Sequence, residues 1–172
     1  GLAKKLGEYK KVSSRKIFND PRNINLGSRI ICSTEKDEDE LFKIIKRTKM
    51  LSNFDEYEKQ RILNCVPDIE KDNLYNKAYL LQYNFENLNS ICWKKGCFVG
   101  QEVTIKMKNK GFLKKKLYVI KSFTKKLNSP EEIKYKNQLI GTTISHCKNV
   151  ALALIEIDKI KNIKKEKDIL II

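Results

Sequence analysis

Histidine, paired cysteines and long apolar runs are scarce or missing in this sequence of 172 residues, and each shortage narrows the function. The one histidine, His146, argues against a closed zinc site, which needs several paired ligands. Five cysteines are present and no two form a C-x-x-C pair, so we expect no disulfide framework. This cysteine usage favours a reducing compartment, either the cytosol or the mitochondrial matrix. His146 and Cys147 are adjacent in an expected strand and point to opposite faces, so we interpret both as structural.

No stretch approaches the roughly 20 apolar residues that a membrane-spanning helix needs, so we expect no membrane partner. No signal peptide is visible either. The chain begins at Gly1 instead of methionine, and we interpret it as part of a longer protein. A targeting segment would then lie outside this chain.

Acidic residues are outnumbered by basic ones: the chain has 36 lysines and arginines and 21 aspartates and glutamates, which gives a formal charge of +15. Such a charge suits nucleic acid, an anionic lipid surface or an acidic protein partner. Lysine, asparagine and isoleucine are abundant throughout, which indicates a compositional bias spread over the whole surface. No RNA-binding aromatic motif, zinc-finger spacing or recognition helix accompanies the charge. We therefore expect no nucleic-acid partner. Nucleic-acid binding is the weakest of three hypotheses for the function, because only the charge supports it.

Local patterns predict helices in the first two thirds of the chain. An acidic run followed by apolar and basic residues over 35–45 predicts a helix, or a strand and a helix joined by a solvated insertion. Asn53 can cap a second helix over 54–64. Residues 101–109 contain no glycine or proline and can start a third helix. A strand is expected over 26–32. Residues 1–14 are weakly patterned, and we interpret them as the last helix and strand of an earlier segment.

The pattern changes after residue 111 to short apolar alternations that are typical of strands. We expect these strands at 117–120, 139–144, 150–157 and 169–172. A loop over 125–136 connects the first two. Short strands at regular spacing after a helical half predict an α+β fold that ends in a small antiparallel β-barrel.

One stretch, Lys95 to Glu102, concentrates the candidate chemistry and reads K-G-C-F-V-G-Q-E. Gly96 and Gly100 bracket Cys97, which predicts a tight backbone bend on both sides of this cysteine. Such a bend can present one thiol at a loop tip, and a following helix N-terminus favours a thiolate. From the residues alone the alternative stays open that Cys97 is small, buried and unreactive.

This stretch resembles the signature of the YgfZ family, which is related to the T-protein, the aminomethyltransferase of the glycine cleavage system. Further segments of the chain resemble family motifs and occur in the family's order, at 20–29, 57–67, 84–89, 114–117 and 141–154. They resemble the family motifs D-P-R…L-G-x-R, Y…R…[IV]-P, N-L-D, R-K-R-L and A-L-A-L. Three departures are visible: Cys65 replaces a glycine, Gln82 replaces a carboxylate, and the residues 106–109, K-M-K-N, stand where relatives often have R-T-H-H.

The resemblance implies a T-protein-like fold in two domains. Residues 1–110 would be the remainder of the folate-binding domain, and residues 111–172 would form the C-terminal antiparallel barrel. It also implies an assembly or repair factor that supports the maturation of [4Fe–4S] proteins in the mitochondrial matrix, without conventional catalytic turnover. Its partners would be A-type carrier proteins and [4Fe–4S] client enzymes.

The resemblance also assigns roles to residues. Cys97 would be the reactive thiol that holds a transient iron–sulfur cluster together with ligands from a partner, because one thiolate does not hold a cluster alone. Lys94 and Lys95 would favour its thiolate form, and Glu102 would cap the backbone or orient a partner. A tetrahydrofolate cavity would be lined by Arg22, Arg29, Gln82 and Gln101.

Two neighbours of Cys97 have further candidate roles. Cys92 is a candidate resolving thiol, and Trp93 is a candidate core anchor. No resident metal site is expected.

The alternative function is a tetrahydrofolate-dependent aminomethyltransferase like the T-protein, which would make the chain a transferase. Gln82 opposes it, since an amide does not supply the charge-assisted pairing with which the family's carboxylate contacts the pterin. The catalytic aspartate of T-protein-like enzymes would also lie outside this chain.

Overall fold

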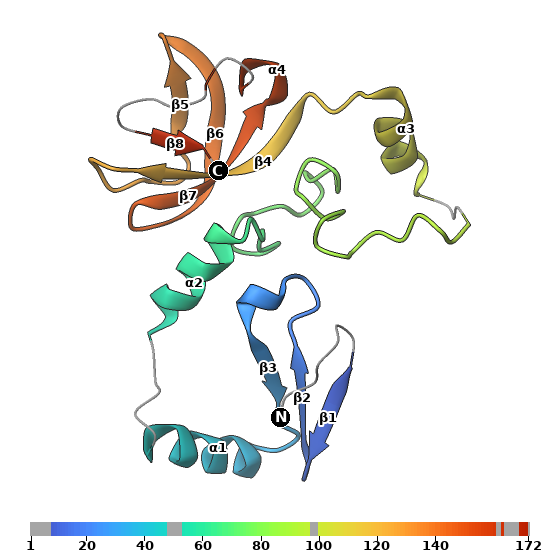
Figure 1. Ribbon diagram of the computed structural model, residues 1–172, viewed down its shortest axis with the longest axis vertical. Helices are drawn as coiled ribbons and strands as arrows, with labels where there is room; N and C mark the ends of the chain where they lie inside the picture. Colours follow the sequence, from blue (N-terminus) through green and yellow to red (C-terminus); the bar gives the residue numbers. More distant parts are fainter. Residues whose placement is uncertain (1–7, 48–52, 97–99, 161–162, 164–168, 172) are drawn as a thin grey trace. The chain divides into compact units, whose positions relative to one another are not determined.

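In a computed structural model the protein forms two compact units, Gly1–Tyr57 and Glu58–Ile172. The structure describes residues 8–47, 53–96, 100–160, 163 and 169–171 (Figure 1). The division falls within helix α2 (Phe54–Leu63). This division describes which residues pack together and does not test the domain boundary expected after residue 110, which stays a prediction. None of the helices in the described ranges is both long and apolar enough to cross a membrane.

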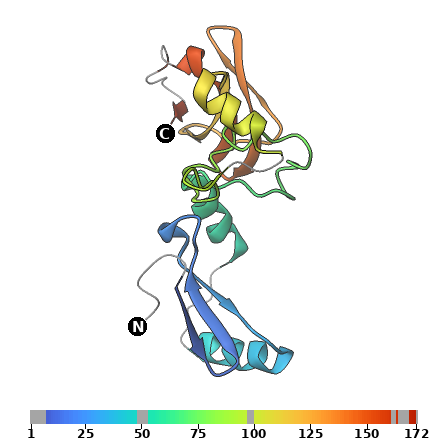
Figure 2. The same cartoon turned by 90° about the vertical axis from the view of Figure 1, so that its right-hand side faces the viewer.

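The first unit contains an antiparallel sheet and one long helix (Figures 1 and 2). The sheet has the order β1-β2-β3, with strands Tyr9–Val12, Arg15–Asn19 and Ser28–Ile31. A short 3-10 turn, η1 (Ile24–Leu26), precedes β3, and helix α1 (Glu35–Arg47) follows it. The strand and the helix expected here are confirmed. The hairpin β1–β2 was not expected, because lysine and arginine interrupt its apolar alternation.

Helix α1 begins at a side-chain cap and closes against the β1–β2 turn. Thr34 Oγ1 accepts a hydrogen bond from the backbone N–H of Asp37 at 3.2 Å, which satisfies one of the free donors of the first turn. The Asp37 carboxylate accepts from Ser14 Oγ and pairs with Arg15 Nε at 3.8 Å. Acidic residues in the first turn and basic residues in the last suit the helix dipole.

Asp20 joins three segments of the first unit. Its buried carboxylate accepts hydrogen bonds from Arg22 Nη2 at 2.8 Å and from Arg29 Nε at 2.6 Å. Both arginines also donate to Tyr57 Oη at 3.2 Å. Burial by itself raises the pKa of Asp20, but the hydrogen bonds from Arg22 and Arg29 outweigh it and lower the pKa to about 2. Arg22 and Arg29 therefore hold a carboxylate of the protein itself.

The second unit contains the rest of α2, a chain of turns, helix α3 (Glu102–Lys110) and a curled antiparallel sheet (Figure 1). The sheet order is β5-β6-β7-β4-β8, and every neighbouring pair is antiparallel. Its strands are β4 (Lys115–Ser122), β5 (Glu132–Tyr135), β6 (Gln138–Cys147), β7 (Val150–Glu156) and β8 (Ile169–Ile171). A single turn of helix, α4 (Ile157–Ile160), follows β7. The α+β class and the four predicted strands are confirmed.

One strand of this sheet, β5, lies inside the loop expected over 125–136. It has four residues and a register shift between Ile133 and Lys134, so it offers little alternation to recognise. Ile133 is nevertheless buried in the core, which explains why this segment pairs with β6.

Strand β7 has both faces covered and divides the core into two clusters. Val150 and Leu152 pack in the cluster that includes Ile62 of α2, whereas Ala151, Ala153 and Ile155 pack in the cluster on the opposite face. The alternation of large and small residues in A-L-A-L thus follows the two-residue period of a strand. A strand buried on both faces needs such a continuous apolar run.

Arg61 is fully buried and connects α2 to the following turns and to β6. Its Nη1 donates to the carbonyl oxygen of Val66 at 2.9 Å and to Asp72 Oδ2 at 3.1 Å. Its Nη2 donates to Glu58 Oε2 at 3.0 Å and to Ser145 Oγ at 2.7 Å. The Asp72 side chain is also buried, at 1% exposure, so each charge depends on the other.

Replacing Arg61 by methionine should destabilise the second unit by about 3–5 kcal/mol, because it leaves the buried Asp72 carboxylate without its partner. Urea denaturation followed by far-UV circular dichroism measures the change in the free energy of unfolding. The control is Lys59→Met in the same helix, expected to change stability by about 0.5 kcal/mol or less. Equal midpoints for the two variants would contradict the role given to Arg61.

The stabilisation from Asp20 should depend on pH with a definite sign. Its folded-state pKa of about 2 lies below the ordinary value of 3.8, so its contribution is present above about pH 4. That contribution is lost as the pH falls from about 4 towards 2. Hydrogen exchange of the β2 and β3 amides should be faster in Asp20→Asn than in the wild type at pH 6, and the difference should shrink near pH 2. A difference that grows on acidification would refute this assignment.

Candidate functional site

The signature stretch leads from the turns of the second unit into α3. Cys97, Phe98 and Val99 lie outside the described residues, so the predicted reactivity of Cys97 stays a prediction. Gly100 has a φ of +92°, a conformation that favours glycine, so the backbone bend predicted on this side of Cys97 is confirmed. The helix predicted after the signature is also confirmed, as α3.

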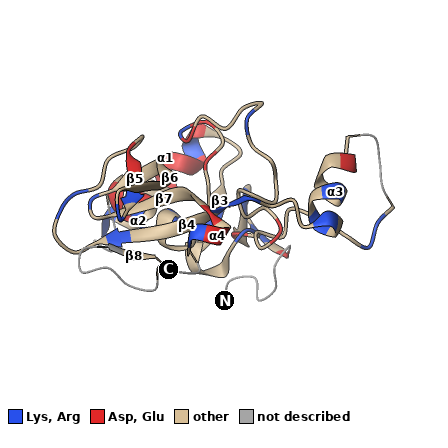
Figure 3. Ribbon diagram, turned by 90° about the horizontal axis from the view of Figure 1, so that it is seen from above, with Lys and Arg blue, Asp and Glu red and all other residues tan. Residues whose placement is uncertain are grey.

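The beginning of α3 contains two of the predicted site residues. Glu102 is the exposed first residue of the helix, where a carboxylate stabilises the helix dipole. Figure 3 shows acidic colour at this end of α3 and basic colour further along it. Gln101 occupies the N-cap position, but its side chain makes no capping hydrogen bond. Its Oε1 atom is buried and, among the described residues, has no hydrogen-bond donor.

A pocket of about 160 Å³ lies against the described part of the signature. It is lined by Leu80, Ser90, Ile91, Cys92, Lys95, Gly100, Gln101 and Thr104. The structure therefore brings Lys95 and Gln101 together and adds Cys92 to them. Gln82 does not line this pocket; its side chain is half-buried, and its carbonyl oxygen accepts from the N–H of Leu117 at 2.7 Å.

Cys92 is an exposed thiol in a turn that favours its thiolate. Backbone hydrogen bonds from Lys95 and Lys94 lower the pKa of Cys92, partial desolvation opposes them, and the Lys95 charge adds to the lowering. The sequence predicts this lysine effect for Cys97; among the described cysteines, it acts on Cys92. Burial does the opposite at Cys65 and raises the pKa of that thiol to about 11.

The four residues expected to line a folate cavity divide between the two units. Arg22 and Arg29 belong to the first unit, where they bind Asp20, and Gln82 and Gln101 belong to the second. In the second unit Gln101 lines the pocket beside the signature and Gln82 does not.

Sequence reasoning missed a cluster of three side chains near the signature, which we call the Trp93 cluster: Trp93, Glu86 and Lys108. Glu86 Oε1 accepts hydrogen bonds from Trp93 Nε1 at 2.9 Å and from Lys108 Nζ at 2.7 Å. The Lys108 ammonium also lies 3.7 Å from the centre of the Trp93 ring. Trp93 is half-buried, so the interpretation of this residue as a core anchor is wrong. The only signal in the sequence is that an indole N–H needs an acceptor.

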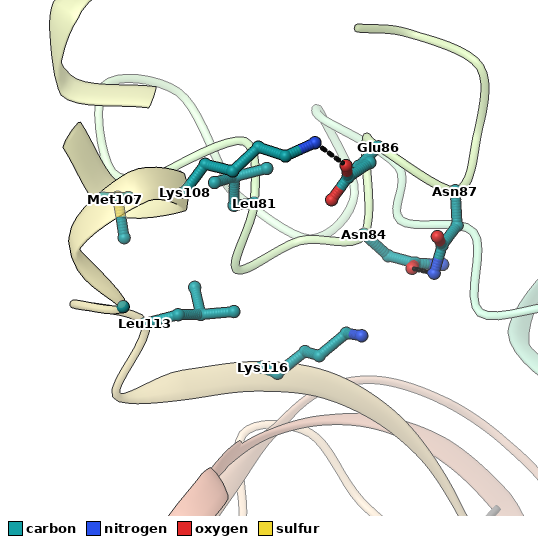
Figure 4. A pocket seen from close by; sticks show the side chains of 9 residues that line it. Leu81, Asn84, Glu86, Asn87, Met107, Lys108, Leu113 and Lys116 are labelled. Atoms are coloured by element: carbon teal, nitrogen blue, oxygen red, sulfur yellow. Dashed lines mark hydrogen bonds and ion pairs between the residues drawn. The ribbon is translucent and has the colours of Figure 1, made fainter. Parts of the chain in front are cut away.

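A second pocket, of about 220 Å³, lies beside this cluster (Figure 4). Leu81, Met107 and Leu113 form its apolar wall, and Glu86 and Lys108 form an ion pair at its edge. The pocket lies between the turns before the signature and the helix after it, so it shows that these two segments face each other.

Metal-binding side chains do not gather in the described parts of the chain, where no group of three or more histidines, cysteines, aspartates and glutamates lies close enough to hold an ion. His146 is exposed and Cys147 is buried, which confirms that they point to opposite faces of β6.

No family model matches the chain. Several relatives are similar to it, among them three that are each named mitochondrial iron–sulfur cluster assembly factor IBA57 or its homologue. The Neurospora crassa homologue is 27% identical over 114 residues, which are 66% of this chain and 25% of the relative. The Dictyostelium discoideum homologue is 26% identical over 116 residues, 66% of this chain and 27% of the relative. The human factor is 26% identical over 150 residues, 84% of this chain and 40% of the relative.

This chain thus spans between a quarter and two fifths of the length of these relatives. The IBA57 factors are similar to YgfZ and to the T-protein of the glycine cleavage system. The resemblance to that family predicted from the signature stretch is therefore confirmed.

Proposed function

We propose that this chain is part of an iron–sulfur cluster assembly or repair factor that supports the maturation of [4Fe–4S] proteins in the mitochondrial matrix. The observation that carries the proposal is the similarity to IBA57 factors over up to 84% of the chain. The K-G-C-F-V-G-Q-E stretch, which resembles the YgfZ signature, also supports it. A T-protein-like fold is part of the proposal: the curled sheet of β4 to β8 would be its C-terminal barrel, after a domain that ends near residue 110.

The iron–sulfur cluster is the cargo in this proposal, and Cys97 supplies one ligand to it. The Cys97 thiolate replaces a donor thiolate on a cluster iron, and the released thiolate takes up the proton that Cys97 gave up, so the exchange is balanced. The remaining ligands come from a partner, an A-type carrier or a [4Fe–4S] client enzyme, since several thiolates are needed to hold a cluster. Lys95 adds positive charge near the site, and Glu102 is exposed at the start of α3, where a partner can contact it.

Tetrahydrofolate is a second ligand that the family resemblance implies, and the described residues fit it only in part. The buried Gln101 Oε1 offers an acceptor for an N–H donor. The pocket that Gln101 lines has about 160 Å³, however, and ligand pockets usually have about 300–1,000 Å³. Gln82 also lacks the charge of the carboxylate that contacts the pterin in T-protein-like enzymes. We therefore derive no step through folate, and aminomethyl transfer is the weaker function.

The test is the activity of aconitase, a [4Fe–4S] enzyme, in cells depleted of the protein and resupplied with variants. Wild type should restore the activity, and Cys97→Ala should leave it at the depleted level because the cluster ligand is lost. Cys32→Ser is the matched control, since Cys32 lies in the first unit, away from the signature in sequence, and it should restore activity like the wild type.

Two results would count against this function. Full rescue by Cys97→Ala would remove the thiol from the chemistry. Normal aconitase activity after depletion would refute the assembly function altogether, and aminomethyl transfer to tetrahydrofolate would then be the reaction to assay.

A further inference from the structure

A third pocket lies in the second unit, between the turns that follow α2 and strand β6. Its volume is about 380 Å³, within the range of about 300–1,000 Å³ that ligand pockets usually have. None of the residues that line it belongs to the signature stretch or lines either of the two pockets near that stretch. The function proposed above therefore leaves this pocket without a role.

Both walls of the pocket are held in place by buried polar contacts. In the wall formed by the turns, Asp72 Oδ2 accepts a hydrogen bond from Arg61 Nη1 at 3.1 Å. In the wall formed by β6, Thr143 Oγ1 donates to the carbonyl oxygen of Asn128 at 2.7 Å and accepts from the backbone N–H of Glu131 at 2.7 Å. The loop between Asn128 and Glu131 is thereby tied to β6. A pocket with two fixed walls needs little rearrangement when a ligand enters, which lowers the cost of binding.

The floor of the pocket is apolar except for one hydroxyl group. Leu74 and Tyr83 belong to the core, and Ile144 packs against it. Tyr83 is only 7% exposed, yet its hydroxyl has no hydrogen-bond partner among the described residues. A buried hydroxyl without an acceptor costs free energy, so an acceptor atom of a ligand would be favoured at this point.

The Tyr83 hydroxyl faces the pocket as a donor. Burial, and the charge of Asp72, raise the pKa of Tyr83, so its hydroxyl keeps the proton. Asp72 itself lines the pocket, and its influence on Tyr83 indicates that the hydroxyl lies on the pocket side of the ring, whereas the ring packs in the core. The floor therefore offers one hydrogen bond to an oxygen acceptor.

The pocket also has one positive charge to offer. Lys71 and Lys77 both line it and are exposed. Lys71 Nζ already pairs with Glu58 at 3.2 Å. Lys77 has no carboxylate partner among the described residues. One ammonium group is thus left for a ligand, and the hydroxyls of Ser129 and Thr142 add donors and acceptors beside it.

We propose that this pocket is a binding site for a small organic carboxylate. The carboxylate pairs with Lys77, the apolar body packs against Leu74 and Ile144, and a second oxygen accepts the hydrogen bond from Tyr83. One negative charge matches the single uncompensated lysine, and the Asp72 carboxylate in the wall opposes a second charge, which favours a carboxylate over a phosphate dianion. The site goes beyond the proposed function and depends on neither Cys97 nor an iron–sulfur cluster.

The experiment titrates the full chain with matched probes and follows binding by saturation-transfer NMR of the probe. 4-Acetylbenzoate combines a carboxylate, a ring and a ketone oxygen. 4-Ethylbenzoate lacks the ketone oxygen, and 4-acetylbenzamide lacks the charge. The wild type should bind 4-acetylbenzoate more tightly than either of the other two, since only this probe satisfies both Lys77 and Tyr83.

Two variants assign the probe to the pocket. Tyr83→Phe keeps the buried ring and should weaken 4-acetylbenzoate by about three- to tenfold, the loss of one hydrogen bond, while leaving 4-ethylbenzoate unchanged. Lys77→Met should weaken both benzoates by about two- to fivefold and leave the benzamide unchanged, because an exposed ion pair is lost. Lys126→Met removes an exposed lysine of the same unit that does not line the pocket, and it should bind all three probes like the wild type.

Three results would overturn the proposal. The first is the absence of saturable binding of 4-acetylbenzoate to the wild type. The second is an equal affinity of the wild type and Tyr83→Phe for this probe, or an equal loss in Lys126→Met, since the probe would then bind elsewhere on a basic surface. The third is tighter binding of phenyl phosphate than of 4-acetylbenzoate, which would exclude the carboxylate. No readout involves aconitase, so this site and the assembly function fail independently.

Discussion

The burial of the Arg61 guanidinium is the constraint on which the second unit depends. A charge without contact with water needs several partners at once, and here they come from three places along the chain: α2, the turns at Val66 and Asp72, and Ser145 on β6. The turns are closed by local backbone hydrogen bonds, such as those from the N–H of Asp72 to Asp68 and from the N–H of Leu74 to Ile69, and Arg61 adds contacts that join them to α2 and β6. The position of the turns then determines where the signature begins.

Much of the fold follows from the sequence, because its strongest signals are local. The Asn53 cap, the acidic start of α1 and the A-L-A-L alternation of β7 each express one physical rule over a few residues. Strand β5 escaped prediction because four residues with one buried isoleucine give no periodicity. The β1–β2 hairpin escaped it because its charged residues hide the strand pattern.

The site is less accessible to sequence reasoning, because its contacts join residues that are far apart along the chain. Gly96 and Gly100 predict the bend, and the absence of glycine and proline over 101–109 predicts the start of α3. Nothing in the sequence indicates that Glu86 would accept hydrogen bonds from both Trp93 and Lys108, since contacts between exposed or half-buried side chains follow no periodicity. The lysines predict a favoured thiolate at Cys97, which stays a prediction, whereas the lowering of the pKa of Cys92 by backbone hydrogen bonds depends on a local geometry that the sequence does not specify.

The separation of Arg61 from Ser145 also matters for how the protein is made. The two residues are 84 positions apart, so at the usual synthesis rate of about 5–20 residues per second roughly 4 to 17 s pass between them. During this interval the guanidinium lacks its Ser145 partner. The buried network around Arg61 is therefore completed only after most of the second unit has been synthesised, so this part of the fold forms late.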